Sequence, residues 1–221
     1  MKERLIRVVR DVIGSCHRTR FKWGRPLGGD KEFTLITNTC IGGVLFHDLH
    51  LRFCSPTINC GIRDHDEYLL FCTHLRHYLS LPLDFVPSKW KYPVAVLHGE
   101  VGDVTVYFTH YHSEEEARSK WRERTARVRY DNLIVLMDGD NCDDCHVETF
   151  DRLPIGRKVI ITMKEYPQCH SVFAIRRKDY PQGNLLEYGL LRGGARWYEL
   201  FDYVHFFNTG KIRRNVFFRN R

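Results

Sequence analysis

The chain has 221 residues, of which 43% are hydrophobic and 13% aromatic, and its formal net charge is +7. A chain of this length buries one good core, so we expect one main domain. No apolar run approaches the ~20 residues of a membrane-spanning helix. Charged residues interrupt the apolar positions at the N-terminus, which argues against a secretory signal.

The positive charge lies at the two ends of the chain. Residues 1–30 carry eight Lys or Arg against three acids, residues 211–221 carry five against none, and the middle of the chain sums to −3. A nucleic-acid enzyme more often carries positive charge on its folded face. We therefore expect no nucleic-acid partner, and we expect the basic ends to meet an anionic membrane surface, with solubility as the alternative reason for their charge.

An amphipathic helix is predicted over residues 2–13. Its apolar residues fall on one face at helical spacing, with arginines between them: Leu5, Val8, Val9 and Val12. Such a helix either lies on anionic lipid or packs on the core with a solvated basic edge. We expect a linker over 14–31, so that a basic N-terminal region, 1–31, precedes a single α/β domain, 32–210, and a basic tail, 211–221.

The segment from Phe33 to Thr57 is the most informative part of the chain. An apolar, β-branched run ends at Asn38, and Cys40 then precedes two glycines and an apolar-periodic stretch. This pattern predicts strand, turn and helix, with Cys40 at the helix N-terminus. The unpaired N–H groups and the helix dipole there favour thiolate over thiol. The segment therefore predicts a reactive cysteine.

Strands and helices alternate through the rest of the main domain. We expect a helix over 64–80, a strand pair at 94–97 and 104–109, a helix opened by the capping pair Ser113 and Glu116, a strand at 133–137, a helix near 143–152, strands at 158–163 and 171–175, and an aromatic segment at 198–207. Alternation of this kind predicts a three-layer α/β fold, and the strand pair predicts a mixed sheet. With no export signal, the eight cysteines are expected to be reduced thiols in a cytosol.

A histidine that follows a strand is the expected partner of Cys40. A cysteine nucleophile needs a base within reach and a third group that orients the base. His110 ends a strand just before a helix, with His112 as a neighbour on the same side. Asp131 and Asp138 flank the next strand and are alternative orienting groups, and Asn38 with the N–H groups after Cys40 would form an oxyanion hole. The alternative is that Cys40 is a small buried hydrophobe and His110 a structural polar residue.

Two further clusters favour a structural reading. Cys142, Cys145 and His146 form half of a zinc motif without a second pair at similar spacing, so we expect no metal and no other cofactor. The acidic loop 138–144 resembles part of a divalent-cation or nucleotide-sugar loop but lacks calcium-loop spacing. Its acids are more typical of a solvated loop and a helix start.

Several segments together resemble one bacterial family. They are ITNTCIGG followed by SPT, then HDEYLLFCTHLRHYLS, YPVAVL, HYHSEEEARSKW, YDNLIVL and FDRLP, which cover about 33–205. In this order they resemble DUF1919, a domain of unknown function often labelled an exopolysaccharide biosynthesis protein. The family's motif opens with two asparagines, a cysteine, an aromatic residue and two glycines. The chain is similar to this motif at Asn38, Cys40, Gly42 and Gly43 and departs from it at Thr39 and Ile41. The order of cysteine and histidine is also similar to that of papain-like enzymes.

The resemblance implies a cytoplasmic step in building or decorating a surface glycan. Our leading hypothesis is a cysteine-dependent acyl-type transferase or hydrolase that acts on a glycan or lipid-linked sugar, in the cytoplasm or at the inner face of the membrane. We assign substrate binding to Gly42, Gly43, Ser55, Thr57, Tyr111 and His112. The alternatives are a glycosyltransferase-like or other sugar-modifying enzyme that uses loop 138–144, and a non-catalytic scaffold held by its basic ends.

Overall fold

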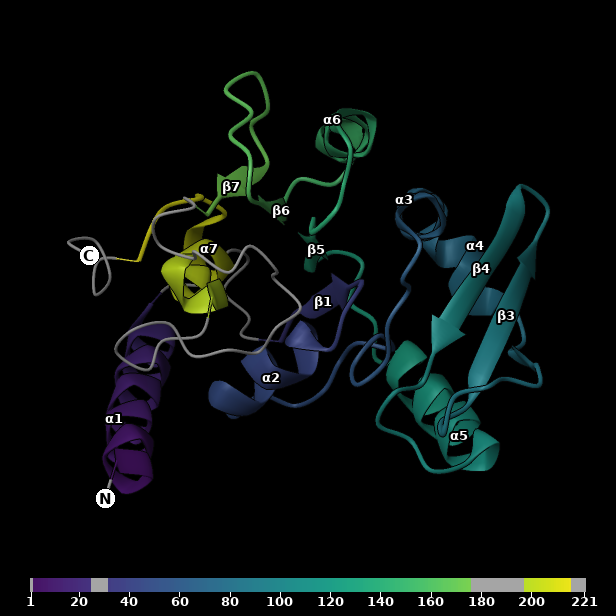
Figure 1. Ribbon diagram of the computed structural model, residues 1–221, viewed down its shortest axis with the longest axis horizontal. Helices are drawn as coiled ribbons and strands as arrows, with labels where there is room; N and C mark the ends of the chain where they lie inside the picture. The colour runs from purple at the N-terminus through teal and green to yellow at the C-terminus, as the bar shows by residue number, and fades with distance from the viewer. Residues whose placement is uncertain (1, 25–31, 176–196, 216–221) are drawn as a thin grey trace.

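Two β-sheets form the framework of the computed structural model, which describes residues 2–24, 32–175 and 197–215 (Figure 1). The first sheet is parallel, with the order β1-β5-β6-β7. Its strands are β1 (Thr34–Thr37), β5 (Leu133–Asp138), β6 (Lys158–Thr162) and β7 (Val172–Ala174). The second sheet is antiparallel, with the order β2-β3-β4, and its strands are β2 (Asp84–Phe85), β3 (Val94–Gly99) and β4 (Gly102–Tyr107).

Helices cover both faces of the parallel sheet (Figure 1). The helices are α1 (Lys2–Trp23), α2 (Ile41–Asp48), α3 (His65–Thr73), α4 (Leu75–Ser80), α5 (Glu114–Thr125), α6 (Asp144–Arg152) and α7 (Tyr203–Thr209), with a 3₁₀ turn at Trp197–Leu200. Helices α2 and α7 lie on one face, where their buried side chains form a cluster with residues of β1, β5 and β6. Helices α3 and α6 lie on the other face, and the antiparallel sheet lies beyond α3. The predicted three-layer α/β fold is confirmed.

The alternation of β5 explains why both of its faces are covered. Ile134 and Leu136 are buried in the cluster with α2 and α7, whereas Val135 and Met137 are buried in the cluster with α3 and α6. Successive side chains of a strand point to opposite faces, so a continuous apolar run is typical of a strand buried on both sides.

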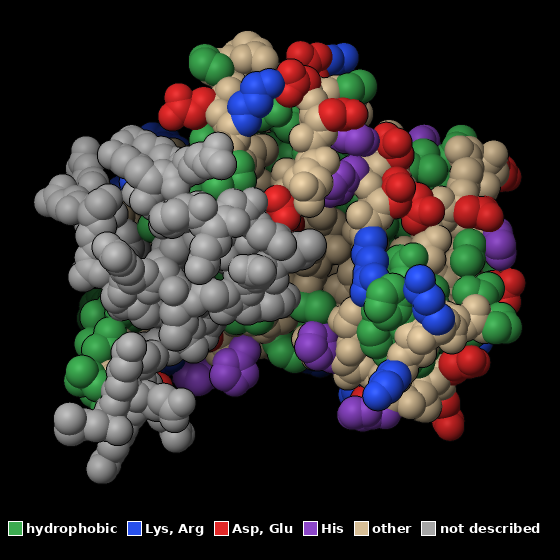
Figure 2. Space-filling model, in the orientation of Figure 1, with side chains coloured by type: hydrophobic (Ala, Val, Ile, Leu, Met, Phe, Trp, Pro, Cys, Tyr) green, Lys and Arg blue, Asp and Glu red, His purple; other side chains and the backbone are tan. Residues whose placement is uncertain are grey.

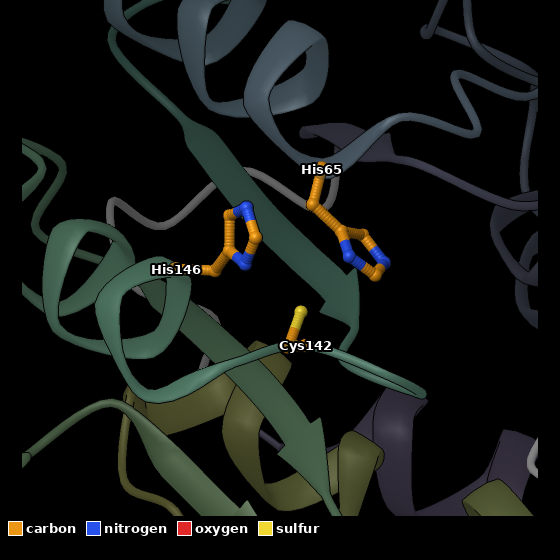
Figure 3. A group of neighbouring side chains, drawn as sticks. All are labelled: His65, Cys142 and His146. Atoms are coloured by element: carbon orange, nitrogen blue, oxygen red, sulfur yellow. The ribbon is translucent and has the colours of Figure 1, made fainter.

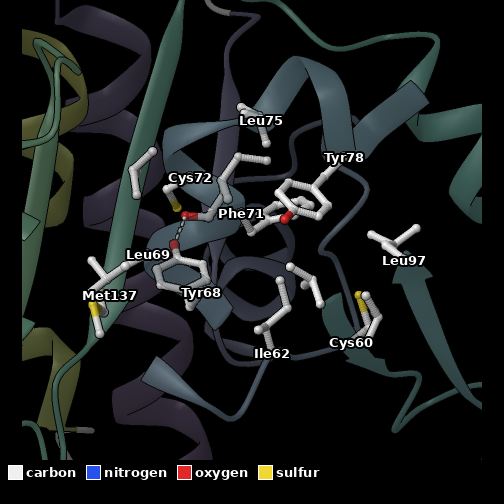
Figure 4. Close-up of a cluster of buried hydrophobic side chains, with 14 of the residues drawn as sticks. Cys60, Ile62, Tyr68, Leu69, Phe71, Cys72, Leu75, Tyr78, Leu97 and Met137 are labelled. Atoms are coloured by element: carbon white, nitrogen blue, oxygen red, sulfur yellow. Dashed lines mark hydrogen bonds between the residues drawn. The ribbon is translucent and has the colours of Figure 1, made fainter. Parts of the chain in front are cut away.

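Tyr68 ties α3 to the parallel sheet. Its side chain is fully buried in the core between α3 and the two sheets (Figure 4), and its hydroxyl lies 3.1 Å from the carbonyl oxygen of Ile36 and 3.0 Å from that of Leu136. A buried hydroxyl without a partner would cost about 1–3 kcal/mol. These contacts therefore fix where α3 begins relative to the ends of β1 and β5.

A short segment at Gly61 joins the two sheets. The N–H of Gly61 donates to the carbonyl of Tyr107 in β4, and the carbonyl of Gly61 accepts from the N–H of Tyr107. The next residue, Ile62, donates its N–H to the carbonyl of Asn38, at the end of β1. A Cβ atom at position 61 would lie 2.9 Å from the Asn38 carbonyl oxygen, so only glycine fits without a shift.

The N-terminal helix is longer than predicted. Helix α1 continues to Trp23, so residues 14–23 are helical and not part of a linker. Its last turns dock on the body through buried His17 and Phe21, close to α7, whereas Leu5 and Val12 near its start are exposed. The helix has no stretch long and apolar enough to cross a membrane, which holds for every helix of the described residues.

Three other expectations change in detail. The predicted strand pair is present as β3 and β4, but it belongs to the separate antiparallel sheet, so parallel and antiparallel strands do not share one mixed sheet. The helix expected over 64–80 breaks at His74. The hydroxyl of Thr73, just before the break, donates to the carbonyl of Leu69, and this kind of contact bends helices.

The C-terminal tail returns to the body as far as buried Asn215, and Arg213 binds the carboxylate of Asp202. The rest of the predicted tail, 216–221, lies outside the described residues.

Candidate functional site

The carboxyl ends of β1 and β5 meet at a pair of polar residues. The side-chain amide of Asn38 donates to the carbonyl of Asp138 at 2.9 Å and accepts from its N–H at 2.8 Å. Both residues line a cavity of about 430 Å³, which is also lined by Thr39, Cys40, Gly61, Ile62, Arg63, His65, Thr109 and Asp140. The carboxyl end of a parallel sheet is where α/β proteins place their ligands, so this cavity is the candidate site.

Cys40 occupies the predicted place at the N-terminus of α2, but its thiol is not activated. Its Sγ atom lies 3.1 Å from Oγ1 of Thr109, and Cys40 makes no side-chain cap to the helix. Burial raises the pKa of the Cys40 thiol, although the Thr109 hydroxyl and the charge of Arg63 act in the opposite direction. Burial is the largest of these influences, and it opposes the preference for thiolate that we expect at a helix N-terminus.

Asp138 is a carboxyl group of the cavity whose pKa is strongly raised. Its side chain is buried at the end of β5, and burial raises its pKa from 3.8 to about 7. The backbone N–H of Asp140 donates to its carboxylate, which lowers the pKa in part, whereas the charge of Asp140 raises it. A group with this pKa exchanges protons at neutral pH, as a general acid or base must.

Arg63 brings a positive charge to the wall of the same cavity. Its guanidinium group lies 4.5 Å from the ring centres of both Trp90 and Tyr107 and donates to the hydroxyl of Tyr92. Such stacking holds an arginine in one place while leaving its charge in solution. The cavity thus combines a thiol, a titratable carboxyl group and a fixed cation.

Cys40 also faces a second cavity, where the structure places His110. This cavity measures about 740 Å³ and lies between α1, α2 and the loop at Asn59. His110 lines it and is exposed, and its neighbour Thr109 is the residue that binds Sγ of Cys40. His112 is exposed and donates its backbone N–H to the carboxylate of Glu116. The structure thus brings Cys40 and His110 to one cavity, and the side-chain partner of the Cys40 thiol is Thr109.

Asp131 lies far from these groups. It precedes β5, whereas Cys40 and Asp138 follow the other ends of β1 and β5, about 20 Å away along the strands. Its carboxylate is exposed and pairs with Arg129, which lowers its pKa. Of the two predicted orienting groups, only Asp138 reaches the site.

The predicted substrate-binding residues have mainly structural contacts. The hydroxyls of Ser55 and Thr57 are buried and bind each other, and Thr57 accepts the N–H of Thr37. The buried Tyr111 hydroxyl donates to the carbonyl of Ile58, and burial raises its pKa. The two glycines of α2 permit close packing: a Cβ at Gly42 would lie 2.9 Å from Oγ1 of Thr37, and one at Gly43 would lie 2.5 Å from Oδ1 of Asn59.

The acidic loop divides between the cavity and the start of α6. Asp138 and Asp140 line the cavity, whereas Asp143 caps α6 by accepting the N–H of His146. Asp144 binds the ammonium group of Lys164 and the hydroxyl of Tyr166. The prediction of a helix start is therefore confirmed for the second half of the loop.

A histidine that the sequence does not single out lies beside this loop. One side-chain donor atom each of His65, Cys142 and His146 lies within 4.8 Å of the others (Figure 3), and these are ligand atoms of the kind that hold a metal. Cys145, the other cysteine of the predicted motif, is exposed and outside this group. The spacing of Cys142 and His146 was the only sequence signal, because His65 comes from a helix far earlier in the chain.

Comparison with known proteins places the chain in a family. A relative from Haemophilus influenzae, described as an uncharacterized protein, is 38% identical over 182 residues, which are 81% of this chain and 85% of the relative. The sequence profile of the domain of unknown function DUF1919 matches residues 20–208. The matched range includes the whole cavity at the ends of β1 and β5. The chain is therefore a member of the DUF1919 family.

Proposed function

We propose that the chain is a cysteine-dependent enzyme that transfers or hydrolyses an acyl group. Its active site would be the cavity at the carboxyl ends of β1 and β5. The observation that supports this proposal most is that Cys40 and Asp138 line the same cavity. A nucleophile and a group whose pKa of about 7 suits proton transfer at neutral pH thus line one cavity.

The proposed reaction has two steps. Asp138 takes the Sγ proton as the sulfur attacks the carbonyl carbon of an ester, and the same carboxyl group returns a proton to the leaving oxygen. The product of this step is a thioester on Cys40 and a free alcohol. Water or a second hydroxyl then attacks the thioester, gives its proton to Asp138, and releases Cys40, whose sulfur regains the proton.

Two neighbours of Cys40 would stabilise the sulfur as it gains charge. Thr109 lies 3.1 Å from Sγ and can turn its hydroxyl hydrogen towards it, and Arg63 adds a fixed positive charge. Both effects already oppose the increase in the pKa of the thiol, and both grow as negative charge develops. In the resting protein the thiol stays protonated, so the nucleophile would form only while a base is taking its proton.

His110 is the competing base in this proposal. It shares the larger cavity with Cys40, so a substrate bound there would lie between the two side chains. This proposal does not give Asn38 the role of an oxyanion donor, because the nitrogen and the oxygen of its side-chain amide both bind the backbone of Asp138. Asn38 would position Asp138.

An activated acyl ester tests the proposal. We expect p-nitrophenyl acetate to be hydrolysed with a rate that rises with pH around an apparent pKa near 7, the value of Asp138. Asp138→Asn should lower the rate by at least about a hundredfold and remove the pH dependence. Asp131→Asn is the matched control and should leave the rate unchanged, because Asp131 lies at the far end of β5. Loss of activity in His110→Asn, with Asp138→Asn unaffected, would assign the base to His110 and contradict the proposal for Asp138.

A second candidate is supported by the pair Asp138 and Asp140. Both acids line the cavity that contains Arg63, and paired carboxylates bind a hard cation that in turn binds a diphosphate. A sugar-transferring enzyme would use such a cation with a nucleotide sugar. Calorimetry with a nucleoside diphosphate sugar and Mn²⁺ would support it, provided that Cys40→Ala keeps full activity and Asp140→Asn abolishes binding.

A role in surface-polysaccharide synthesis remains a prediction from the family resemblance. The substrate that this role would require, a glycan or lipid-linked sugar, carries hydroxyls of the kind that would accept the acyl group in the proposed reaction. Acyl transfer from an activated ester to a sugar hydroxyl, followed by mass spectrometry of the product, would test this step directly.

A further inference from the structure

We propose that His65, Cys142 and His146 bind a zinc ion where α3 meets the loop before α6. This site lies beside the cavity of the proposed function but does not depend on it. His65 is the first residue of α3, Cys142 follows β5, and His146 lies in the first turn of α6. All three side chains are half-buried, which is typical of metal ligands that are shielded from bulk water but still within reach of an entering ion.

The three donor groups converge on one point. Figure 3 shows the two imidazole rings and the thiol pointing towards one another from their three segments. Their donor atoms lie within 4.8 Å of one another. With zinc bonds of about 2.1 Å to nitrogen and about 2.3 Å to sulfur, tetrahedral ligands are about 3.5 Å apart. Small side-chain rotations would close the remaining distance.

The segments that carry the ligands are held in place independently. The hydroxyl of Tyr68, one turn after His65, is fixed to the carbonyls of Ile36 and Leu136. The side chain of Asp143 caps α6 by accepting the backbone N–H of His146, a contact that leaves the imidazole ring free. The rings of His65 and His146 pack edge to face, with centres 5.4 Å apart. A site on rigid helix starts loses little conformational entropy when an ion binds.

Carboxylates flank both nitrogens of His146. Nδ1 of His146 lies 2.7 Å from Oδ1 of Asp143 and also faces the backbone N–H of Asp143. Nε2 of His146 lies 3.2 Å from Oδ1 of Asp66. Whichever nitrogen binds the metal, the other can donate its hydrogen to a carboxylate, as metal-bound histidines commonly do. The carboxylate beside the metal-binding nitrogen is then in place as a fourth ligand. Figure 2 shows histidine and acidic side chains gathered where α3 and α6 meet.

The donor set indicates zinc. A thiolate with two imidazoles suits Zn²⁺, which accepts nitrogen and sulfur in a tetrahedral arrangement. Ca²⁺ and Mg²⁺ prefer oxygen ligands and are excluded by the chemistry of the three side chains. Three such ligands with a water or carboxylate in the fourth position are typical of zinc sites that take part in chemistry. His65 also lines the cavity with Asp138, so a zinc ion here would lie at its wall.

Cobalt binding to the 221-residue chain tests this site without any substrate. The protein is stripped of metal with a chelator and titrated with Co²⁺, whose complex with a thiolate absorbs in the near ultraviolet. We expect one Co²⁺ per chain, a thiolate charge-transfer band, the visible bands of a tetrahedral complex, and displacement by one equivalent of Zn²⁺. Elemental analysis of the zinc-loaded chain should likewise give one zinc ion.

Two cysteine variants of the same loop make the test specific. Cys142→Ser should lose the charge-transfer band, whereas Cys145→Ser, changed three residues away at an exposed position, should keep it. His65→Asn should weaken cobalt binding by at least about tenfold, and it serves if Cys142→Ser fails to fold. Absence of stoichiometric binding, or a thiolate band that persists in Cys142→Ser, would overturn the proposal. Activity of Asp138→Asn has no bearing on this result, so the two proposals fail separately.

Discussion

Asn38 and Asp138 hold each other by two reciprocal hydrogen bonds, although they lie 100 residues apart in the chain. Asn38 follows β1 and Asp138 is the last residue of β5, and the amide of Asn38 satisfies both backbone groups of Asp138. The contact therefore does two things: it joins the ends of β1 and β5, and it holds in place the backbone that carries the Asp138 carboxyl group.

Removing this amide should destabilise the fold. We expect Asn38→Ala to lower the free energy of unfolding by about 2–3 kcal/mol, because two buried backbone groups of Asp138 lose their partner. Urea denaturation at pH 7 measures the change. Glu100→Ala, at an exposed position of the turn between β3 and β4, is the control and should stay within about 0.5 kcal/mol. An Asn38→Ala protein as stable as the parent would show that the two strand ends do not need this contact.

The segment that joins the two sheets should not tolerate a side chain at position 61. We expect Gly61→Ala to cost about 1–3 kcal/mol, because its Cβ would press on the carbonyl oxygen of Asn38. Gly156→Ala is a matched control, since nothing lies within 4 Å of a Cβ there. Thermal unfolding of the two variants compares them directly. Equal midpoints would contradict the close approach of the two sheets at this point.

His17 should make the docking of α1 sensitive to acid. Its imidazole is buried against the hydroxyl of Tyr203. Burial and the charge of Arg20 lower the pKa of His17 from 6.5 to about 4. The charges of Asp202 and Asp48 raise this pKa and oppose the shift in part. Between pH 6.5 and pH 4, His17 of the unfolded chain therefore binds a proton, whereas His17 of the folded chain does not. Stability should be complete above pH 6.5 and fall by up to about 3 kcal/mol as the pH drops to 4.

A neutral replacement separates this effect from other titrations. His17→Gln keeps a polar group near Tyr203 but cannot titrate, so its free energy of unfolding should fall less than that of the parent between pH 7 and pH 4. The difference between the two proteins, measured by denaturant unfolding at each pH, isolates the contribution of His17. Parallel curves over this range would contradict the lowered pKa.

The start of α1 should bind anionic lipid through its exposed apolar residues. Leu5 is 66% exposed and Val12 58%, and they lie in a basic segment of the chain. We expect the protein to co-sediment with vesicles that contain phosphatidylserine and not with neutral vesicles. The double variant Leu5→Glu and Val12→Glu should lose this binding, while Val101→Glu, at an equally exposed site on the β3–β4 turn, should keep it. Equal binding of both variants would contradict the prediction.

The sequence predicts the strands and helices well where one periodicity dominates. The apolar run of β5 and the capping pair of α5 are both present in the structure, because local propensity and burial favour the same element there. The length of α1 was missed, since its second half contains Gly14 and several polar residues that are typical of a linker. Its helix is stabilised instead by packing of His17 and Phe21 on the body, which no local pattern shows.

The candidate site could be predicted only in part. The sequence predicts the place of Cys40 from the strand, turn and helix around it, and the place of Asp138 from the end of the apolar run of β5. The protonation states do not follow, because burial sets them, and burial depends on the segments that cover the cavity. His65 was missed for a similar reason, since only the packing of α3 on the sheet brings it to Cys142.

Acylation of Cys40 tests the central claim most directly. A protein with Cys16→Ser and Cys145→Ser, which lacks the two exposed thiols, is mixed with p-nitrophenyl acetate, quenched in acid, digested and examined by mass spectrometry. We expect one acetyl group on Cys40, formed faster as the pH rises through about 7 and not formed on Cys40 in Asp138→Asn. Acetyl groups spread over several cysteines, or an unmodified Cys40 in a protein that still hydrolyses the ester, would contradict the account.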